Sequence, residues 1–265
     1  MDEMTPRLTC LLALCFAAAC APSGADSGGD EAAPSPAWGE GERSVSGNAF
    51  FFDMEDFGEI DWIQDLEGAR LYVFEAPELE VTLSPEDEHA FRIDGVPDGV
   101  EVTLALTHPD FLPHLTATHL VDGGDLENLT FQSVSLRIAE MAGDLLQVDT
   151  LDPERCQMAT TVTAPAPENI WAPGEPGATV SLDPPVPDDQ GPYYFNELVL
   201  PTLTLIETTT DGGVTVVDAE PGEYLWTGHK DGVEFGALKM KCVGGWLTNA
   251  SPPWGMNVID GAGSN

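Results

Sequence analysis

The chain has 265 residues, of which 46 are Asp or Glu and 9 are Lys or Arg, so its formal net charge is −37. It lacks the clustered Lys and Arg that bind phosphates, which excludes nucleic acid as an expected partner and disfavours an anionic lipid surface. The acidic residues are spread through the chain, a pattern that keeps a protein soluble in salty media.

The N-terminus, "MTPRLTCLLALCFAAAC" (residues 4–20), predicts a secretion signal. Arg7 supplies a short positive region, and the apolar run after it is shorter than the roughly 20 residues that cross a bilayer as a helix. The small residues before Cys20 resemble a bacterial lipobox, which implies cleavage before the cysteine and lipid attachment to its thiol. We therefore predict a lipoprotein signal peptide at 1–19 and a membrane anchor on Cys20. An ordinary cleaved signal peptide is the alternative.

Residues 20–44 are rich in Gly, Ser, Pro, Ala and acid, which predicts a disordered tether. Ala21 rather than Asp follows the cysteine, and in Gram-negative lipoproteins this resembles an outer-membrane address. Removal of residues 1–19 takes away one Arg and two acids and leaves a net charge of −36. We expect a lipid-anchored protein of the cell envelope, at the outer membrane.

The five cysteines leave one pair for a disulfide. Cys10 and Cys15 leave with the signal, and Cys20 carries lipid. Only Cys156 and Cys242 then remain, in a compartment where disulfides persist. We predict a bridge between them, with two buried free thiols as the alternative.

Short strand-like segments, separated by Gly, Pro, Asp and Asn turns, predict a mainly β body. Alternating apolar residues in "VEVTLAL" indicate a strand with one buried face. The strands expected in the first half lie at 44–54, 69–76, 88–96, 99–108, 115–121 and 129–134.

An acidic segment at residues 53–67 holds seven Asp and Glu residues. Calcium takes about six to eight oxygen ligands, but these acids do not follow the EF-hand order around Gly58. We expect a solvated charged loop, and a calcium site is the alternative.

Three histidines, His108, His114 and His119, lie within twelve residues and are of a type that binds Zn²⁺ or Cu²⁺. Their spacing is poor for a shared metal, because residues five apart on a strand face opposite sides of the sheet. We expect polar surface residues on a loop and its exit strand, and no metal.

Residues 134–152 predict a linker helix between two halves of the body. Its apolar face is formed by residues at spacing i, i+3, i+4 and i+7: Ile138, Met141, Ala142 and Leu145. Gly143 weakens the helix. We expect the helix to pack on one half or between the two.

The second half repeats motifs of the first in the same order. "PGATVSLDP" (176–184) echoes "EGARLYVFE" (67–75), and "GGVTVVDAEPGEYLWTG" (212–228) echoes "HAFRIDGVPDGVEVTLA" (89–105). Each half contains a Pro-Gly corner, where Pro fixes φ and Gly tolerates positive φ, so we expect a tight reversal between adjacent strands. The order predicts an internal duplication.

These motifs resemble the carboxypeptidase-regulatory-like domain, a transthyretin-like sandwich. The first copy departs from that family at "PEDEH" and "HPDFLPH", which stand where the family has an Asp-Gly turn and a Gly-Tyr. The resemblance implies two transthyretin-like antiparallel β-sandwiches, at 45–133 and 153–260. It also implies a structural or binding role without catalytic residues.

The Pro-Gly corner also occurs in intradiol dioxygenases, where it supplies a tyrosine ligand to iron. Tyr224 holds that position and His229 follows it, while Tyr193 or Tyr194 is a candidate second phenolate. The second histidine of the site is missing, and Fe(III) needs its full ligand set. We expect no enzyme and no cofactor, with Tyr224 as a core or rim aromatic.

Two tryptophans near the C-terminus, Trp246 and Trp254, are candidate ligand-binding residues, because exposed aromatic rings on a sandwich edge stack on sugars. The alternative is that they cap a hydrophobic core. The sequence thus predicts a non-catalytic envelope lipoprotein that acts as a surface scaffold, adhesive or ligand-binding module. Its expected partners are the membrane, envelope proteins and glycans, and a carbohydrate-binding surface protein is the alternative.

Overall fold

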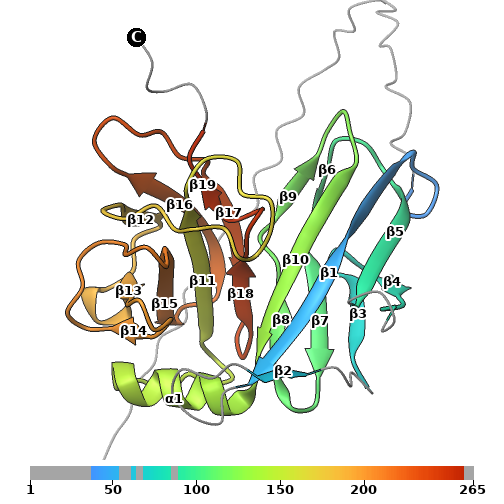
Figure 1. Cartoon of the computed structure of the whole chain (residues 1–265). Helices are drawn as coiled ribbons and strands as arrows, with labels where there is room; N and C mark the ends of the chain where they lie inside the picture. Colours follow the sequence, from blue (N-terminus) through green and yellow to red (C-terminus); the bar gives the residue numbers. More distant parts are fainter. Residues whose placement is uncertain (1–36, 54–60, 64–67, 85–88, 260–265) are drawn as a thin grey trace, which may run out of the picture. The chain divides into compact units, whose positions relative to one another are not determined.

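Strands form most of the regular structure in the parts of the chain that the computed structural model describes, which are residues 37–53, 61–63, 68–84 and 89–259 (Figure 1). These parts contain one α-helix, so the prediction of a mainly β fold with a short helix is confirmed. They belong to one compact unit, Ser35–Asn265. Cys20, most of the expected tether and most of the acidic segment lie outside the described residues.

The first half contributes ten strands within the described residues: β1 (Arg43–Asp53), β2 (Asp61–Ile63), β3 (Arg70–Val73), β4 (Ala76–Val81), β5 (Ala90–Val96), β6 (Val100–Val102), β7 (Leu104–His108), β8 (Phe111–Leu115), β9 (His119–Val121) and β10 (Leu126–Val134). The second half begins with α1 (Leu136–Leu146), and its other elements are β11 (Cys156–Thr163), β12 (Thr179–Asp183), a 3-10 turn η2 (Asp188–Gln190), β13 (Tyr193–Phe195), β14 (Pro201–Thr202), β15 (Gly213–Ala219), β16 (Gly222–His229), β17 (Leu238–Cys242), β18 (Leu247–Ala250) and β19 (Met256–Asn257).

The strand pairing of the first half recurs in the second. In the first half β1 pairs in parallel with β10 and antiparallel with β5. In the second half β11 pairs in parallel with β18 and antiparallel with β15. The other layer also repeats, since β7 pairs antiparallel with β3 and β8, and β16 pairs antiparallel with β12 and β17. The two halves therefore share one arrangement of six strands, as an internal duplication requires.

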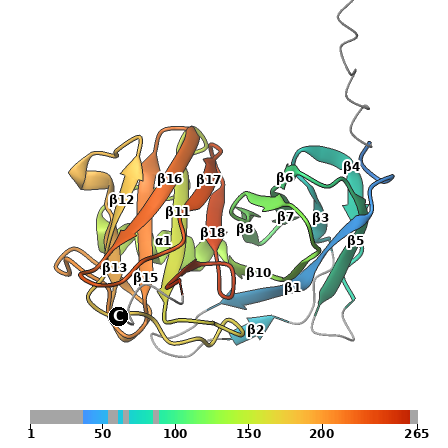
Figure 2. The same ribbon diagram turned by 90° about the horizontal axis from the view of Figure 1, so that it is seen from above.

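A parallel pair joins the two halves edge to edge. Leu247 and Thr248 of β18 lie opposite His114 and Leu115 of β8. One sheet therefore runs from β14 in the second half to β4 in the first, in the order β14-β13-β15-β11-β18-β8-β7-β3-β4. Figure 2 shows β8 and β18 next to each other where the green and red halves meet.

Each half has its own hydrophobic core. Phe51, Phe131 and Leu104 are fully buried in the first, and Trp226 and Met240 in the second. Complete burial of an apolar side chain of this size stabilises a fold by about 1.5–3 kcal/mol. These side chains alternate with outward-facing residues along their strands, as the sequence pattern predicts.

From the sequence we expected each Pro-Gly corner to reverse the chain between two paired strands. The structure shows a different role for both corners. The corner at Pro97–Gly99 leads from β5, which pairs with β1, to β6, which pairs with β9. The corner at Pro221–Gly222 leads from β15, which pairs with β11, to β16, which pairs with β12. Both corners thus carry the chain from one layer to the other. A turn without ladder hydrogen bonds suits Pro, which has no N–H to donate.

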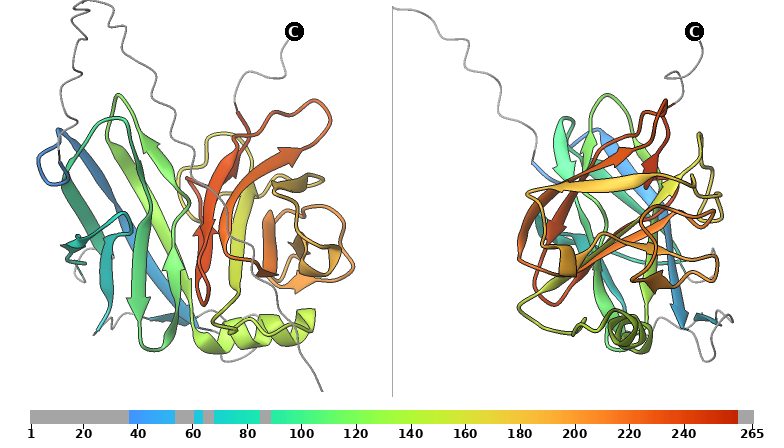
Figure 3. Two further views of the ribbon diagram at one scale, coloured as in Figure 1. Left: turned by 180° about the vertical axis from the view of Figure 1, so that it is seen from behind. Right: turned by 90° about the vertical axis from the view of Figure 1, so that its left-hand side faces the viewer.

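Helix α1 begins where the two halves meet and runs along one end of the second half (Figure 3). The Ser135 hydroxyl caps its N-terminus by accepting the Ile138 N–H at 3.2 Å. Ala139 packs with Leu112 of β8 and Leu247 of β18, which meet at the joined edges. The helix therefore packs between the halves, one of the two positions we expected.

The helix face that is buried differs from the prediction by one position. Ala139, Gly143 and Leu146 are buried. Of the four residues that we predicted for the apolar face, three are half-buried and one is exposed: Ile138, Met141 and Ala142 are half-buried, and Leu145 is 38% exposed. Gly143 is needed there, because a Cβ at this position would lie 2.7 Å from the Val148 carbonyl oxygen. The predicted apolar stripe is thus only partly covered by protein.

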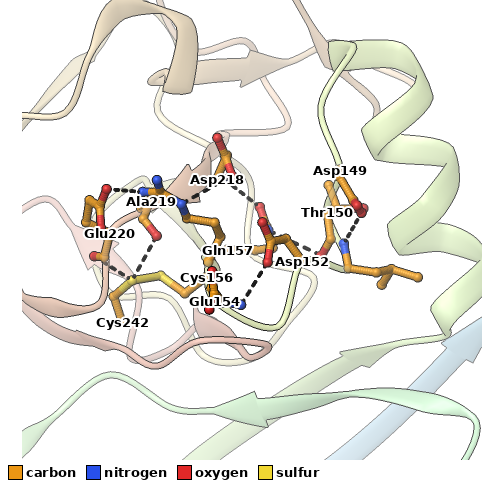
Figure 4. Close-up of polar contacts among 12 residues, drawn as sticks. Asp149, Thr150, Asp152, Glu154, Cys156, Gln157, Asp218, Ala219, Glu220 and Cys242 are labelled. Carbon is orange, nitrogen blue, oxygen red and sulfur yellow. Dashed lines mark hydrogen bonds and ion pairs between the residues drawn. A yellow bond between two sulfur atoms is a disulfide. The ribbon is translucent and has the colours of Figure 1, made fainter.

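A disulfide joins Cys156 at the start of β11 to Cys242 at the end of β17, with the Cα atoms 5.5 Å apart (Figure 4). It connects the two layers of the second half, and the predicted pairing is confirmed. Next to it, Gln157 donates from Nε2 to the Thr150 carbonyl at 3.2 Å and accepts the Asp218 N–H at Oε1, at 3.1 Å. The bridge and Gln157 together hold the segment after α1 against the second Pro-Gly corner.

Candidate ligand-binding cavity

A cavity of about 410 Å³ lies between α1 and the outer face of the second half's larger layer. Successive residues of β11 and β15 face opposite sides, so Met158 and Val216 enter the core while Ala159, Thr215 and Val217 line the cavity. One face of the large sheet therefore packs against the core of the second half, and its other face forms one wall of the cavity.

The opposite wall is the apolar stripe of α1. Ile138, Met141 and Ala142 line the cavity, which explains why the helix leaves them half-buried. Sequence periodicity found this stripe, but it indicated packing against protein rather than a wall of a cavity. Among the buried helix residues, Ala139 packs against Leu112 and Leu247, and Gly143 lies against Val148 and Thr150 of the segment that follows the helix.

Exposed apolar residues form the mouth. Trp171 is 68% exposed and Val199 is 45% exposed, and both line the cavity. Val199 has a φ of +60°, a conformation that is a genuine outlier for a β-branched residue. Its turn is held by the Asn196 side chain, whose Oδ1 accepts the Leu198 N–H at 2.9 Å. The turn thus exposes the apolar side chain of Val199 at a position of positive φ, which Gly or Asn usually occupies.

A charged side chain, that of Asp211, contributes to the cavity lining. The Asp211 carboxylate accepts the Gly213 N–H at 3.0 Å, and burial raises the pKa of this carboxyl. A Cβ on Gly213 would lie 2.6 Å from Asp211 Oδ1 and 2.7 Å from Cγ of Phe195. The carboxylate and the phenyl ring therefore both pack closely against Gly213, where no side chain would fit.

A second, shallower pocket adjoins the first and shares Ile170 and Trp171 with it. Its other lining residues lie on β1 and β10, just before β5, in the loop before Trp171 and in the loop after β18: Asn48, Phe50, Asn128, Thr130, His89, Glu168, Asn169 and Pro253. Trp171 therefore stands between an apolar cavity and a more polar surface.

The tryptophans that we singled out from sequence lie elsewhere. Trp254 is half-buried against the first core, donates its indole N–H to the Glu127 carbonyl at 2.7 Å, and has its ring 5.4 Å from that of His119. Trp246 is half-buried with its ring 6.5 Å from Phe74. Both contact the first half, so the structure places them in the contact between the halves.

The histidine cluster is not the surface loop that we expected. His114 is fully buried in β8, with Nδ1 2.9 Å from the Ser133 hydroxyl, and His119 lies on a separate strand against Trp254. Burial lowers the pKa of His114 to about 3 and that of His119 to about 4. We took the segment before His114 for a loop because of Pro113, which lies opposite a register shift in the β7–β8 ladder.

The residues weighed for an iron site do not converge. Tyr224 is 6% exposed and donates its hydroxyl to the Glu220 carbonyl at 2.8 Å, so it is the core aromatic we expected. His229 lies on the other face of the same strand, with Nε2 2.7 Å from the Ser181 hydroxyl. The Tyr194 hydroxyl accepts a backbone N–H from β12.

Among the described residues, no group of three or more His, Cys, Asp or Glu side chains is placed to hold a metal ion. The possible calcium site in the segment 53–67 falls mainly outside these residues. Within the same described ranges, no helix is long and apolar enough to cross a membrane.

Fold and cavity together define a mainly β, disulfide-bridged protein with two similar halves. No protein-family model matches the chain, and no curated protein matches it. Several solved structures are similar to this chain at a low level. The Bacillus anthracis TIE protein is 10% identical with a TM-score of 0.24, and the match covers 83% of this chain and 34% of that one, so the chain spans about a third of its length.

Two further similar structures are pilins. GBS52, the minor pilin of Streptococcus agalactiae, is 8% identical with a TM-score of 0.27, over 83% of this chain and 98% of that one. A streptococcal ancillary pilin is 8% identical with a TM-score of 0.25, over 82% and 69%. Likeness at this level carries no argument about the role of the present chain.

Proposed function

We propose that the protein is a non-catalytic lipoprotein of the cell envelope, whose two transthyretin-like sandwiches form one rigid binding or scaffold module. The observation that carries the proposal is the continuous sheet from β14 to β4, which joins the halves through β8 and β18. A rigid body of this kind holds a binding surface in a fixed position, which is what a scaffold or a binding module requires.

Contacts beyond the shared sheet support this rigidity. Lys239 of β17 pairs with Glu101 of β6 at 2.7 Å and accepts the Thr118 N–H at its carbonyl, at 2.8 Å. Lys241 pairs with Glu75 in the turn between β3 and β4, where both side chains are largely buried. The more buried Lys241–Glu75 pair is screened less by salt than the exposed Lys239–Glu101 pair, so it contributes more to holding the halves together.

The proposed placement in the envelope rests on the N-terminal sequence and on the disulfide. Disulfides persist in exported proteins and are rare in the cytosol. On this proposal lipid on Cys20 anchors the chain at the outer membrane and residues 20–44 form the tether. The first sandwich then spans 45–133, the linker helix 134–152 and the second sandwich 153–260.

The anchor is tested by mass spectrometry of the mature N-terminus and by membrane fractionation. We expect acyl-modified Cys20 as the first residue, and we expect Cys20→Ser to abolish the modification and release the protein from membranes. Cys15→Ser, a matched change inside the signal, leaves both results unchanged. An unmodified N-terminus at any residue contradicts the lipid anchor while leaving export in place.

The non-catalytic role is tested separately by metal content and colour. Protein purified in the presence of iron is expected to be colourless and free of stoichiometric iron. A coloured sample that loses its colour on Tyr224→Phe would favour the dioxygenase alternative. Glycan binding through Trp246 or Trp254 stays a prediction, which a glycan array checks.

A further inference from the structure

We propose that the cavity between α1 and the large sheet binds a small apolar molecule that carries one positive charge, with Asp211 and Phe195 holding the cationic group. The inference deepens the proposed binding role and rests on it, but it is independent of the lipid anchor. Each of its parts follows from a different feature of the cavity.

The size and lining fit a small organic molecule. A volume of about 410 Å³ lies within the roughly 300–1,000 Å³ that is usual for ligand pockets. The walls are mainly aliphatic, with the stripe of α1 on one side and residues such as Leu247 and Val217 on the other. These walls match the body of an apolar ligand and give its charged group a single place to bind.

Charge selects a cation. Asp211 is the one ionisable side chain among the described residues that line the cavity. The whole chain has a net charge of −37, so its field concentrates cations and repels anions. An anionic ligand would bring a second negative charge beside a half-buried carboxylate, which is unfavourable.

Aromatic rings favour an organic cation over a metal ion. Phe195 and Asp211 lie beside each other against Gly213 in the cavity lining, and Trp171 lines the same cavity at its mouth. Ammonium groups are attracted to the faces of aromatic rings, and tryptophan is the strongest partner. A single carboxylate does not provide the six or more oxygens that calcium takes.

The mouth carries strain that folding alone does not require. Val199 holds a φ of +60° with its side chain exposed, and the neighbouring Leu198 is also exposed. Strained residues persist where the surroundings impose them, and they cluster at binding sites. A glycine at position 199 would relieve the strain, so Val199 is explained by the apolar contact that it offers a ligand.

The test uses three water-soluble probes with the same apolar part, titrated calorimetrically into the full mature chain: 4-phenylbutyltrimethylammonium, 4-phenylbutan-1-ol and 4-phenylbutyrate. We expect saturable binding of the ammonium, at least about tenfold tighter than the alcohol, with the carboxylate weakest. Asp211→Asn keeps an acceptor for the Gly213 N–H and should remove the preference for the ammonium over the alcohol. Asp188→Asn, an equal charge change outside the cavity, should preserve it.

Two variants at the mouth separate binding from folding. Trp171→Ala should weaken the ammonium and the alcohol alike, and Val199→Gly should raise the melting temperature while weakening both probes. The proposal is overturned if the ammonium does not saturate at millimolar concentration, or if the three probes bind equally. It is also overturned if Asp211→Asn leaves the preference intact. These outcomes leave the test of Cys20 untouched.

Discussion

Loss of the Cys156–Cys242 bridge should lower stability strongly and in a single transition. The two cysteines are 86 residues apart in sequence, and a loop of this length implies about 4–5 kcal/mol of stabilisation in the chain-entropy model. For a folded unit of this size each kcal/mol shifts the melting temperature by about 2–4 °C, so the expected fall is roughly 10–15 °C. Alanine is the better replacement, because both sites are buried and a serine hydroxyl would need a hydrogen-bond partner.

The assay is thermal unfolding of Cys156→Ala/Cys242→Ala, followed by calorimetry and by circular dichroism. Wild-type protein with and without a reductant is the chemical counterpart of the variant. Because β8 and β18 share one ladder, we expect both halves to melt together in each sample. A melting temperature that does not change refutes the stabilising role of the bridge. Two separate transitions refute the coupling between the halves.

Three further outcomes follow from buried groups. The pKa of His114 is about 3 in the fold against 6.5 in the unfolded chain, so its contribution to stability is complete only above about pH 6.5. The free energy of unfolding should fall as the pH drops toward 3, by on the order of 5 kcal/mol, which urea midpoints across pH will measure. His114→Leu should flatten that dependence. Gly143→Ala should lower the free energy of unfolding, measured in urea, by roughly 1–3 kcal/mol, because the new Cβ would collide with the Val148 carbonyl oxygen. This loss should exceed the gain in helix propensity from replacing Gly with Ala. Asp211→Asn should raise the melting temperature at pH 7, because the raised pKa shows that the charged carboxylate opposes folding above that pKa, and the gain should vanish as the pH falls below about 4.

Local signals in the sequence account for much of the fold. Alternation in "VEVTLAL" marked β6 and β7, the echo of "AEPGEY" marked β16, and the count of cysteines identified the disulfide. Each of these depends on neighbours in sequence or on simple elimination. β8 was missed because Pro113 is typical of a loop. The register shift that accommodates Pro113 arises from the pairing of β8 with β7, and residue types alone do not show that pairing.

The cavity was harder to predict, because its walls come from segments far apart in the chain. The stripe on α1 was visible, but periodicity cannot tell a face that packs on protein from one that lines a cavity. A usable signal did exist at the mouth. "NELVLP" and "NIWAP" place Leu198, Val199 and Trp171 in turns, where apolar residues have no folding reason to lie. Asp211 gives no such signal, because it reads as an ordinary Asp-Gly turn.

The pairing of β8 with β18 also determines whether either half would stay soluble without the other. Taken alone, each half would present the unpaired backbone groups of one of these strands to solvent. An open strand of this kind is a template for pairing with another chain and hence for aggregation. Each half therefore covers the unpaired edge strand of the other. Truncation at the helix would yield two fragments that self-associate through these edges, rather than two independent modules.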